Sequence, residues 1–170
     1  MKVKIKKTQK NATIPYKTHA EDFCYDCVAI SEEEVAPNVW KYGLGLAFQI
    51  ERDIEALSSS ISFDGGRESF YKKVFDFSRS PIQLSIDARP RSSVWKTGMI
   101  LSNCEGTIDE LYRGEVSAVF YHVFPHMPRY KVGDRICQIK LGFTLPMEFV
   151  EVGELGETSR GEGGYGSTGR

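Results

Sequence analysis

The sequence LGLAFQIE at residues 44–51 alternates large apolar side chains with small or polar ones. Successive side chains of an extended strand project to opposite faces, so its leucines, phenylalanine and isoleucine would share one face. This alternation predicts a strand that is buried on one side. Residues 82–88 repeat the pattern and predict a second strand of the same kind.

Further strands are predicted on both sides of these two. Residues 2–6 alternate lysine with Val3 and Ile5, which is typical of a short edge strand whose lysines discourage pairing between sheets. Residues 116–124 are rich in β-branched and aromatic side chains and predict a strand buried on both faces. Residues 136–141 and 147–152 complete the set. Many short strands with few helices predict an all-β sandwich or jelly roll.

Helical signals are weak and short. Residues 53–60 place a few apolar side chains on one helical face, and residues 92–98 have serine at the start and glycine at the end, as in a short capped turn. Residues 153–170 are rich in Gly, Ser, Thr and charge, with Tyr165 as the one aromatic residue. Such a segment cannot bury a core of its own, so it is a frayed tail or a strap that orders on a ligand.

The composition favours an ordinary globular protein. The 170 residues are 41% hydrophobic and 26% charged, with a net charge of −1, and their number suits one domain. A protein that coats nucleic acid by charge is usually basic, so we expect no nucleic-acid partner. No apolar run is long enough to span a membrane, and none follows the basic start as a signal peptide would require. We therefore expect no membrane partner and a cytoplasmic location, or the host cytoplasm or nucleus if the chain is viral.

The cysteines raise one alternative that the spacing disfavours. His19 and Glu21, followed by Cys24 and Cys27, contain both halves of a zinc-deaminase signature. The halves are separated by two residues only, and so short a segment can hardly surround a metal while leaving Glu21 free as a base. We expect free thiols there and at the other cysteines, Cys104 and Cys137.

Four segments carry residues suited to nucleotide chemistry. Residues 160–169 combine frequent glycines with an arginine and two hydroxyls, which suits close approach of the backbone to phosphate oxygens. Residues 106–116 predict a β-hairpin that crowds Asp109, Tyr112 and Arg113 together. Residues 89–93 place two arginines before a helical turn whose serine cap would offer N–H groups to an anion. Residues 133–138 predict a tight turn into a strand.

Taken in order together with residues 23–27, these segments resemble the five motifs of the trimeric dUTPase family. Residues 23–27, FCYDC, resemble the first motif, A-G-Y-D-L, and residues 90–93, PRSS, resemble the second. Residues 103–115 resemble the third, and residues 133–138, GDRICQ, the fourth. Residues 160–169 match the fifth, R-G-x-G-G-[FY]-G-S-T-G, at nearly every position.

The resemblance implies a distorted jelly-roll β-barrel over residues 1–152, with residues 153–170 as a flexible strap that closes the active site. It implies a homotrimer with sites at the subunit interfaces. Each site would take motifs one, two and four from one chain, motif three from a second and the tail from a third. The implied reaction is hydrolysis of dUTP to dUMP and pyrophosphate by attack of water on the α-phosphorus, with Mg²⁺ as cofactor.

The family's residue roles carry over to matching positions. Asp109 would orient and deprotonate the attacking water. Asp26 would support Mg²⁺ from its outer shell through water, or serve only as a hydrogen-bond acceptor in a turn. The phosphates would be bound by Arg91, Ser92, Ser93, Gln138, Arg160, Ser167 and Thr168. The other substrate contacts would come from Asn103, Gly106, Ile108, Tyr112, Tyr165 and Gly166. Of these, Tyr165 would stack on uracil and Tyr112 would pack under the deoxyribose.

Two departures from the family pattern leave room for other interpretations. Phe23 and Cys24 replace a small Ala-Gly pair, and an insertion of about residues 51–78 lengthens the chain. A dCTP deaminase shares the fold and an R-S-S stretch like residues 91–93. A regulatory binding protein built on the same scaffold would dock a protein partner through residues 53–71.

Overall fold

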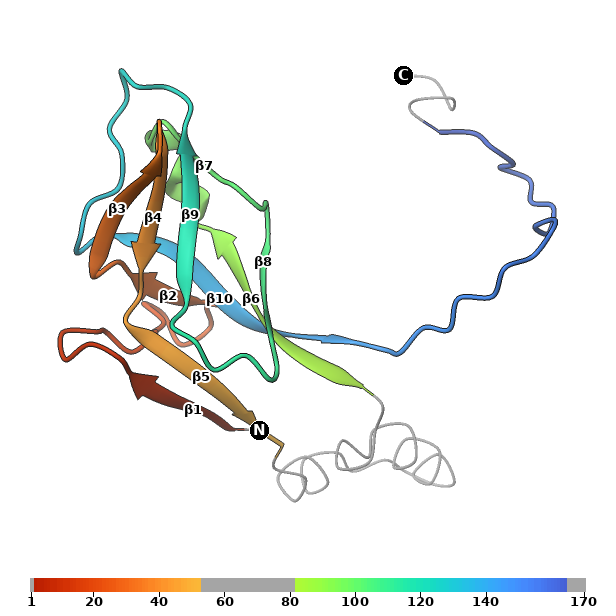
Figure 1. Cartoon of the computed structure of the whole chain (residues 1–170), viewed down its shortest axis with the longest axis horizontal. Coiled ribbons are helices and arrows are strands. Elements are labelled where there is room, and N and C mark those ends of the chain that lie inside the picture. The colour runs from red at the N-terminus through yellow and green to blue at the C-terminus, as the bar shows by residue number, and fades with distance from the viewer. Residues whose placement is uncertain (1, 53–81, 165–170) are drawn as a thin grey trace.

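The computed structural model describes residues 2–52 and 82–164 (Figure 1). This part of the chain is built from ten strands and one 3₁₀ helix, which confirms the predicted all-β class. The predicted helix at 53–60 and nearly all of the insertion lie outside the described residues. The elements are β1 Lys2–Lys7, β2 Tyr25–Val28, β3 Ser31–Ala36, β4 Val39–Gly43, β5 Leu46–Glu51, β6 Gln83–Pro90, η1 Ser92–Lys96, β7 Met99–Leu101, β8 Gly106–Asp109, β9 Ser117–His122 and β10 Arg135–Thr144.

The strands form two four-stranded sheets and one two-stranded sheet. One sheet has the order β2-β10-β6-β8, the other β3-β4-β9-β7, and β1 pairs with β5. All pairings are antiparallel. Figure 1 shows β1 and β5 at one end of the molecule and the chain after β10 leading away from the sheets. Among the described residues no helix is long and apolar enough to cross a membrane.

The core lies between the inward faces of the sheets. Tyr42 of β4 and Phe120 of β9 are fully buried, and their rings meet edge to face with centroids 5.9 Å apart. Tyr130 joins them, and its carbonyl accepts a hydrogen bond of 2.8 Å from the Tyr42 hydroxyl. The opposite sheet contributes Ile136 of β10 and its neighbour Cys137, both fully buried. This shared aromatic and aliphatic core holds the two sheets in a fixed relation.

The strand observed in this region is shorter than the one predicted at 44–51. β4 ends at Gly43 and β5 begins at Leu46, because Gly45 adopts a left-handed φ of 64° that a strand cannot contain. The large apolar side chains from Leu46 to Ile50 are buried as predicted. The break turns the chain from the β3-β4-β9-β7 sheet into the β1-β5 pair.

Three other strand predictions were wrong in part. β9 alternates between buried and exposed side chains, so the strand predicted at 116–124 is buried on one face only. Residues 147–152 form no strand in the single chain, since they follow the last strand and have no partner there. The hairpin predicted at 106–116 does not form: β8 pairs with β6, and the chain then crosses to β9 in the other sheet.

The helical turn predicted at 92–98 is present as η1, but its predicted cap is wrong. The N-cap residue is Arg91, which has extended backbone and makes no side-chain capping hydrogen bond. The C-cap is Thr97 rather than a glycine. A turn of five residues without a serine cap offers little as an anion site by itself.

Candidate functional site

A pocket of about 280 Å³ opens where the two sheets meet at β7, β8 and β9. Its lining includes five of the residues singled out by the third motif: Asn103, Gly106, Ile108, Asp109 and Tyr112. A Cβ at Gly106 would lie 3.2 Å from the side-chain amide nitrogen of Asn103, so Asn103 would have to shift by a few tenths of an ångström to admit it. The sequence segment 103–112 therefore folds around one cavity with a carboxylate on its wall.

The position of Asp109 follows from the end of β8. The β6–β8 ladder stops at the pair Ser85–Asp109, and the Tyr112 N–H donates to the Asp109 carbonyl at 3.0 Å. The Tyr112 hydroxyl in turn donates to the Glu115 carbonyl at 3.2 Å. This tight turn presents an exposed carboxylate and an aromatic ring on the same pocket.

Glu115 was missed by sequence reasoning as a residue of the pocket. Its carboxylate accepts hydrogen bonds from the Thr8 hydroxyl at 2.6 Å and from the Gly45 N–H at 3.2 Å. It thereby attaches the loop after Asp109 to the end of β1 and to the break between β4 and β5. No local pattern reveals this role, because Thr8 and Glu115 are 107 residues apart.

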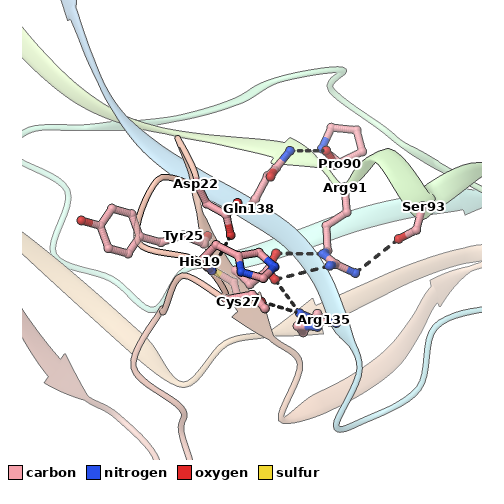
Figure 2. A network of polar contacts seen from close by, with 11 residues as sticks. His19, Asp22, Tyr25, Cys27, Pro90, Arg91, Ser93, Arg135 and Gln138 are labelled. Atoms are coloured by element: carbon pink, nitrogen blue, oxygen red, sulfur yellow. Dashed lines mark hydrogen bonds and ion pairs between the residues drawn. The ribbon is translucent and has the colours of Figure 1, made fainter.

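A second cluster surrounds Asp26 on the β2-β10-β6-β8 sheet (Figure 2). Arg91 donates to both oxygens of the Asp26 carboxylate, from Nε at 2.8 Å and from Nη2 at 3.3 Å. Arg135 donates to Oδ2 at 3.0 Å. Arg91 also reaches the Ser93 hydroxyl at 3.3 Å, and the Gln138 amide donates to the Pro90 carbonyl at 3.2 Å. Two guanidinium groups oriented by one carboxylate make a cationic surface suited to phosphate oxygens.

Arg135 belongs to this cluster although sequence reasoning gave it no role. It is the arginine of the G-D-R segment, which was the one available signal. Ser92, by contrast, is exposed, and within the described part of the chain no hydrogen bond joins its side chain to the cluster. Register explains the gathering, because Asp26 of β2 is the partner of Gln138 on β10, and Gln138 is the partner of Arg89 on β6.

Beneath Asp26 two buried thiols face each other. Cys27 of β2 and Cys137 of β10 are register partners, and both are fully buried. The hydrogen bond with the Cys137 thiol and burial raise the pKa of the Cys27 thiol well above its usual value. A thiol held in this neutral form is a poor nucleophile, so Cys27 is unsuited to covalent chemistry. Cys24 is half-buried and Cys104 is exposed, and all four thiols are free.

The two clusters remain separate within one chain. The pocket lining contains none of Asp26, Arg91, Ser92, Ser93 or Gln138. Arg160 lies in the exposed C-terminal segment, and its Nε donates to the nearby Gly163 carbonyl at 2.8 Å. The predicted contacts Tyr165, Gly166, Ser167 and Thr168 lie outside the described residues. A single chain thus presents the third-motif residues and the Asp26 cluster at separate places.

The fold and the two clusters define a class: jelly-roll proteins that bind nucleotides. The dUTPase family model matches residues 78–169. The deoxyuridine 5'-triphosphate nucleotidohydrolases of Clostridium novyi and Nautilia profundicola are 31% and 32% identical to this chain. The first alignment covers 99% of both chains, and the second covers 100% of both. The chain belongs to the dUTPase family.

Solved structures agree on the fold. A mutant of the Staphylococcus bacteriophage 80alpha dUTPase with dUpNHpp has a TM-score of 0.68 and 18% identity, with 99% of each chain covered. A mutant dUTPase from phage phi11 of S. aureus, which coordinates a structural Mg(II) ion, has a TM-score of 0.60 and 14% identity. That alignment covers 92% of this chain and 100% of the phage protein.

Proposed function

We propose that this dUTPase hydrolyses dUTP to dUMP and pyrophosphate, and that the pocket between β7, β8 and β9 holds the nucleoside. The observation that carries the proposal is the gathering of Asn103, Gly106, Ile108, Asp109 and Tyr112 around one cavity. The Asn103 amide and the β8 backbone offer donors and acceptors for the edge of a uracil ring. Tyr112 offers an aromatic face for the deoxyribose.

Asp109 acts as the base in this proposal. Its carboxylate is exposed on the pocket wall, where it can accept a proton from a water that attacks the α-phosphorus. Strand pairing with Ser85 and the hydrogen bond from the Tyr112 N–H hold the backbone from which this carboxylate projects. The pocket has a volume suited to a small ligand, near the lower end of the range for drug-sized sites.

The Asp26 cluster supplies the phosphate side. Arg91, Ser93 and Gln138 would bind phosphate oxygens, and Asp26 orients Arg91 and Arg135 toward them. A carboxylate has about four lone-pair sites. Three donors already occupy sites on Asp26, namely Arg91 Nε, Arg91 Nη2 and Arg135 Nη1. One site remains for a water, which agrees with an outer-shell role toward a metal.

The side chains around Asp26 suit a Mg²⁺ ion whose ligands come mainly from the substrate. Among the described residues no three His, Cys, Asp or Glu side chains are grouped to hold a metal. Mg²⁺ commonly keeps several waters and takes its other ligands from phosphates and one or two carboxylates. When bound, it would neutralise charge that develops on the triphosphate. Asp26 would hold one of its waters, while Arg91 and Ser93 hold the phosphate oxygens.

We further propose that the active protein is a homotrimer whose sites combine both clusters from different chains. The exposed C-terminal segment supports this arrangement. Phe143, Leu145, Met147, Phe149 and Val150 are 58% to 89% exposed in the single chain, which leaves a row of apolar side chains uncovered. The segment also leads away from its own sheets (Figure 1), so residues 153–170 would close a site on another subunit.

Product analysis with a panel of nucleotides tests the function. Pyrophosphate release from dUTP should exceed release from dTTP, dCTP and UTP, and it should fall when Mg²⁺ is removed. Conversion of dCTP with release of ammonia would instead indicate a dCTP deaminase. A protein that releases no pyrophosphate from dUTP under any of these conditions would contradict the proposal.

A further inference from the structure

Arg52 joins three segments beside the proposed base. It follows directly on Glu51, the last residue of β5, and its guanidinium makes a two-pronged contact with Glu110. Nε donates to Oε1 at 2.8 Å and Nη2 to Oε2 at 2.6 Å. Nη2 also donates to the Ile82 carbonyl at 2.9 Å. The end of β5, the start of the chain leading into β6 and the residue after Asp109 therefore meet at one guanidinium.

Glu110 extends the sheet beyond Asp109. The β6–β8 ladder ends at the pair Ser85–Asp109. The next N–H along β6, that of Leu84, donates to the Glu110 carboxylate at 3.3 Å. A side chain thus takes the place that a backbone carbonyl would occupy in a longer ladder. Asp109 is consequently held on one side by strand pairing and on the other by the attachment of Glu110 to β6 and Arg52.

The ion pair between Arg52 and Glu110 is partly buried and two-pronged, which makes it stronger than an ordinary surface ion pair. The side chains of Arg52 and Glu110 are 24% and 20% exposed, so water screens them less than it screens an exposed pair. A planar guanidinium that meets both carboxylate oxygens fixes direction as well as distance. The hydrogen bonds from Arg52 lower the pKa of the Glu110 carboxyl, which keeps the pair charged at neutral pH.

We infer that Arg52 and Glu110 are positioning residues for the hydrolysis, because they fix the turn that aims the Asp109 carboxylate into the pocket. The inference rests on the proposed role of Asp109. The same contacts relate the insertion to the proposed base. Arg52 and Ile82 stand immediately before and after residues 53–81 in the sequence, and both take part in the contacts beside Asp109. Neither side chain lines the pocket, so both act through Asp109 and make no contact with the nucleotide there.

Substitution of either residue should lower kcat and leave KM nearly unchanged. Arg52→Gln and Glu110→Gln each remove the two-pronged contact but leave the pocket lining intact. We expect kcat for dUTP to fall by about 10- to 100-fold, since a misplacement of about 1 Å can cost that much. KM should stay within about threefold, because ground-state binding is not altered. Arg52→Lys keeps the charge without the fork and should recover part of kcat.

The double variant tests whether the two residues act as one unit. If they do, Arg52→Gln combined with Glu110→Gln should lose about as much kcat as either single variant. Multiplied losses would mean that the residues act separately and would overturn the inference. So would a wild-type kcat in Arg52→Gln, or a rise in KM that matches the fall in kcat.

A neighbouring ion pair provides the matched control. Lys4 of β1 and Glu51 of β5 form an ion pair of 2.9 Å next to Arg52 in the sequence, but their side chains are 60% and 41% exposed. Glu51→Gln should therefore retain wild-type kcat and KM. Melting curves of all variants distinguish a loss of folding from a loss of positioning. If Arg52→Gln is unstable, Arg52→Lys provides the kinetic test in its place. A wild-type protein that does not hydrolyse dUTP would contradict the proposed function instead.

Discussion

Asp109 combines an exposed carboxylate with a backbone that is hydrogen-bonded on both sides. Asp109→Asn keeps the shape of the side chain but cannot take a proton from water. We expect kcat to fall by about 10²- to 10⁴-fold, the usual contribution of a positioned base, with dUTP affinity changed by no more than a few-fold. Steady-state kinetics and direct binding of a non-hydrolysable analogue measure the two effects. Retention of more than about a tenth of kcat would assign the base elsewhere.

A second residue-scale feature stabilises the β3-β4-β9-β7 sheet with residues that do not line the pocket. Arg129 stacks on the Trp40 ring at 3.6 Å from its centroid and donates to both oxygens of Glu32, at 2.9 and 3.2 Å. The Arg129 and Glu32 side chains are 18% and 25% exposed. The hydrogen bonds from Arg129 hold the pKa of the Glu32 carboxyl below its usual value of 4.5. The pair therefore links β3 to the segment that leads into β10.

Glu32→Gln should lower stability in a pH-dependent way. At neutral pH we expect a loss of about 1–3 kcal/mol, the range for hydrogen bonds to charged groups and for a buried group left unpaired. A depressed folded-state pKa contributes stability that is complete above the unfolded pKa and is lost as pH falls through the folded pKa. The gap between wild type and variant should thus close as pH falls below 4.5. Urea unfolding at fixed protein concentration measures it.

Glu33→Gln is the control for this experiment. Glu33 is exposed on the same strand and faces away from Arg129. Its substitution should change stability by less than about 0.5 kcal/mol, as is usual at the surface. A stability gap in Glu32→Gln that stays constant through the acid range would show that the Arg129 contact does not depend on charge.

At the scale of elements, the break between β4 and β5 depends on Gly45. Its φ of 64° is costly for any other residue, and an added Cβ would overlap the Ile30 side chain and lie 3.0 Å from the Ala12 Cβ. Gly45→Ala should therefore cost about 1–2 kcal/mol of backbone strain and a further ~1–3 kcal/mol of overpacking. Thermal or urea unfolding measures the total.

Gly133 separates the two causes. It also has a positive φ, of 94°, but an added Cβ there would meet nothing within 4 Å. Gly133→Ala should show the strain cost alone and should be the milder substitution. Equal losses at the two positions would mean that Ile30 and Ala12 yield to the new methyl group.

The same elements show what local sequence can predict. Alternation from Leu46 to Ile50 predicted a half-buried strand, since facing is decided by neighbours two residues apart. Which strands pair with each other is decided by contacts between distant residues, and local sequence does not reveal these contacts. The hairpin predicted at 106–116 was therefore wrong, because β8 pairs with β6. The alternation also gave no sign of Gly45's left-handed turn, which the carboxylate of Glu115 supports from 70 residues away.

Local sequence likewise predicts some features of the candidate site and not others. Motif spacing predicted which side chains of segment 103–112 matter, and the structure places them around one pocket. The contacts that orient these residues come from outside the motifs. Arg52 lies 58 residues from Glu110, and no periodicity relates them. The motif therefore indicated which residues gather at the pocket, whereas the contact of Arg52 with Glu110 emerges only from the fold.

At the scale of the whole molecule, the exposed apolar row after β10 predicts association. Phe149 and Leu155 are 89% and 87% exposed in the single chain. We expect a homotrimer by light scattering at micromolar concentration. Truncation after Thr144 removes all of this row except Phe143, which belongs to β10, and should give monomers or aggregates. A stable monomer of full length that hydrolyses dUTP would exclude shared sites.

Truncation after Gly153 should separate folding from catalysis. It removes Arg160 and the glycine-rich end, but none of the core residues in the described part of the chain. The shortened protein should fold, form trimers and melt close to the full-length protein. It should lose most of its hydrolysis, because a segment that closes on the phosphates excludes water from the reaction. Full activity in the shortened protein would make residues 154–170 dispensable.

Mixing the two defective proteins tests whether a site draws on several chains. Chains truncated after Gly153 keep Asp109 but lack the tail, whereas full-length Asp109→Asn chains keep the tail but lack the base. Each parent alone should be nearly inactive. After subunit exchange with the truncated chains in excess, mixed trimers should recover hydrolysis, because an intact Asp109 from one chain can then meet a tail from another. Native mass spectrometry establishes that mixed trimers are present. If they are present and remain inactive, base and tail must come from the same chain, and the separation of the two clusters would require another explanation.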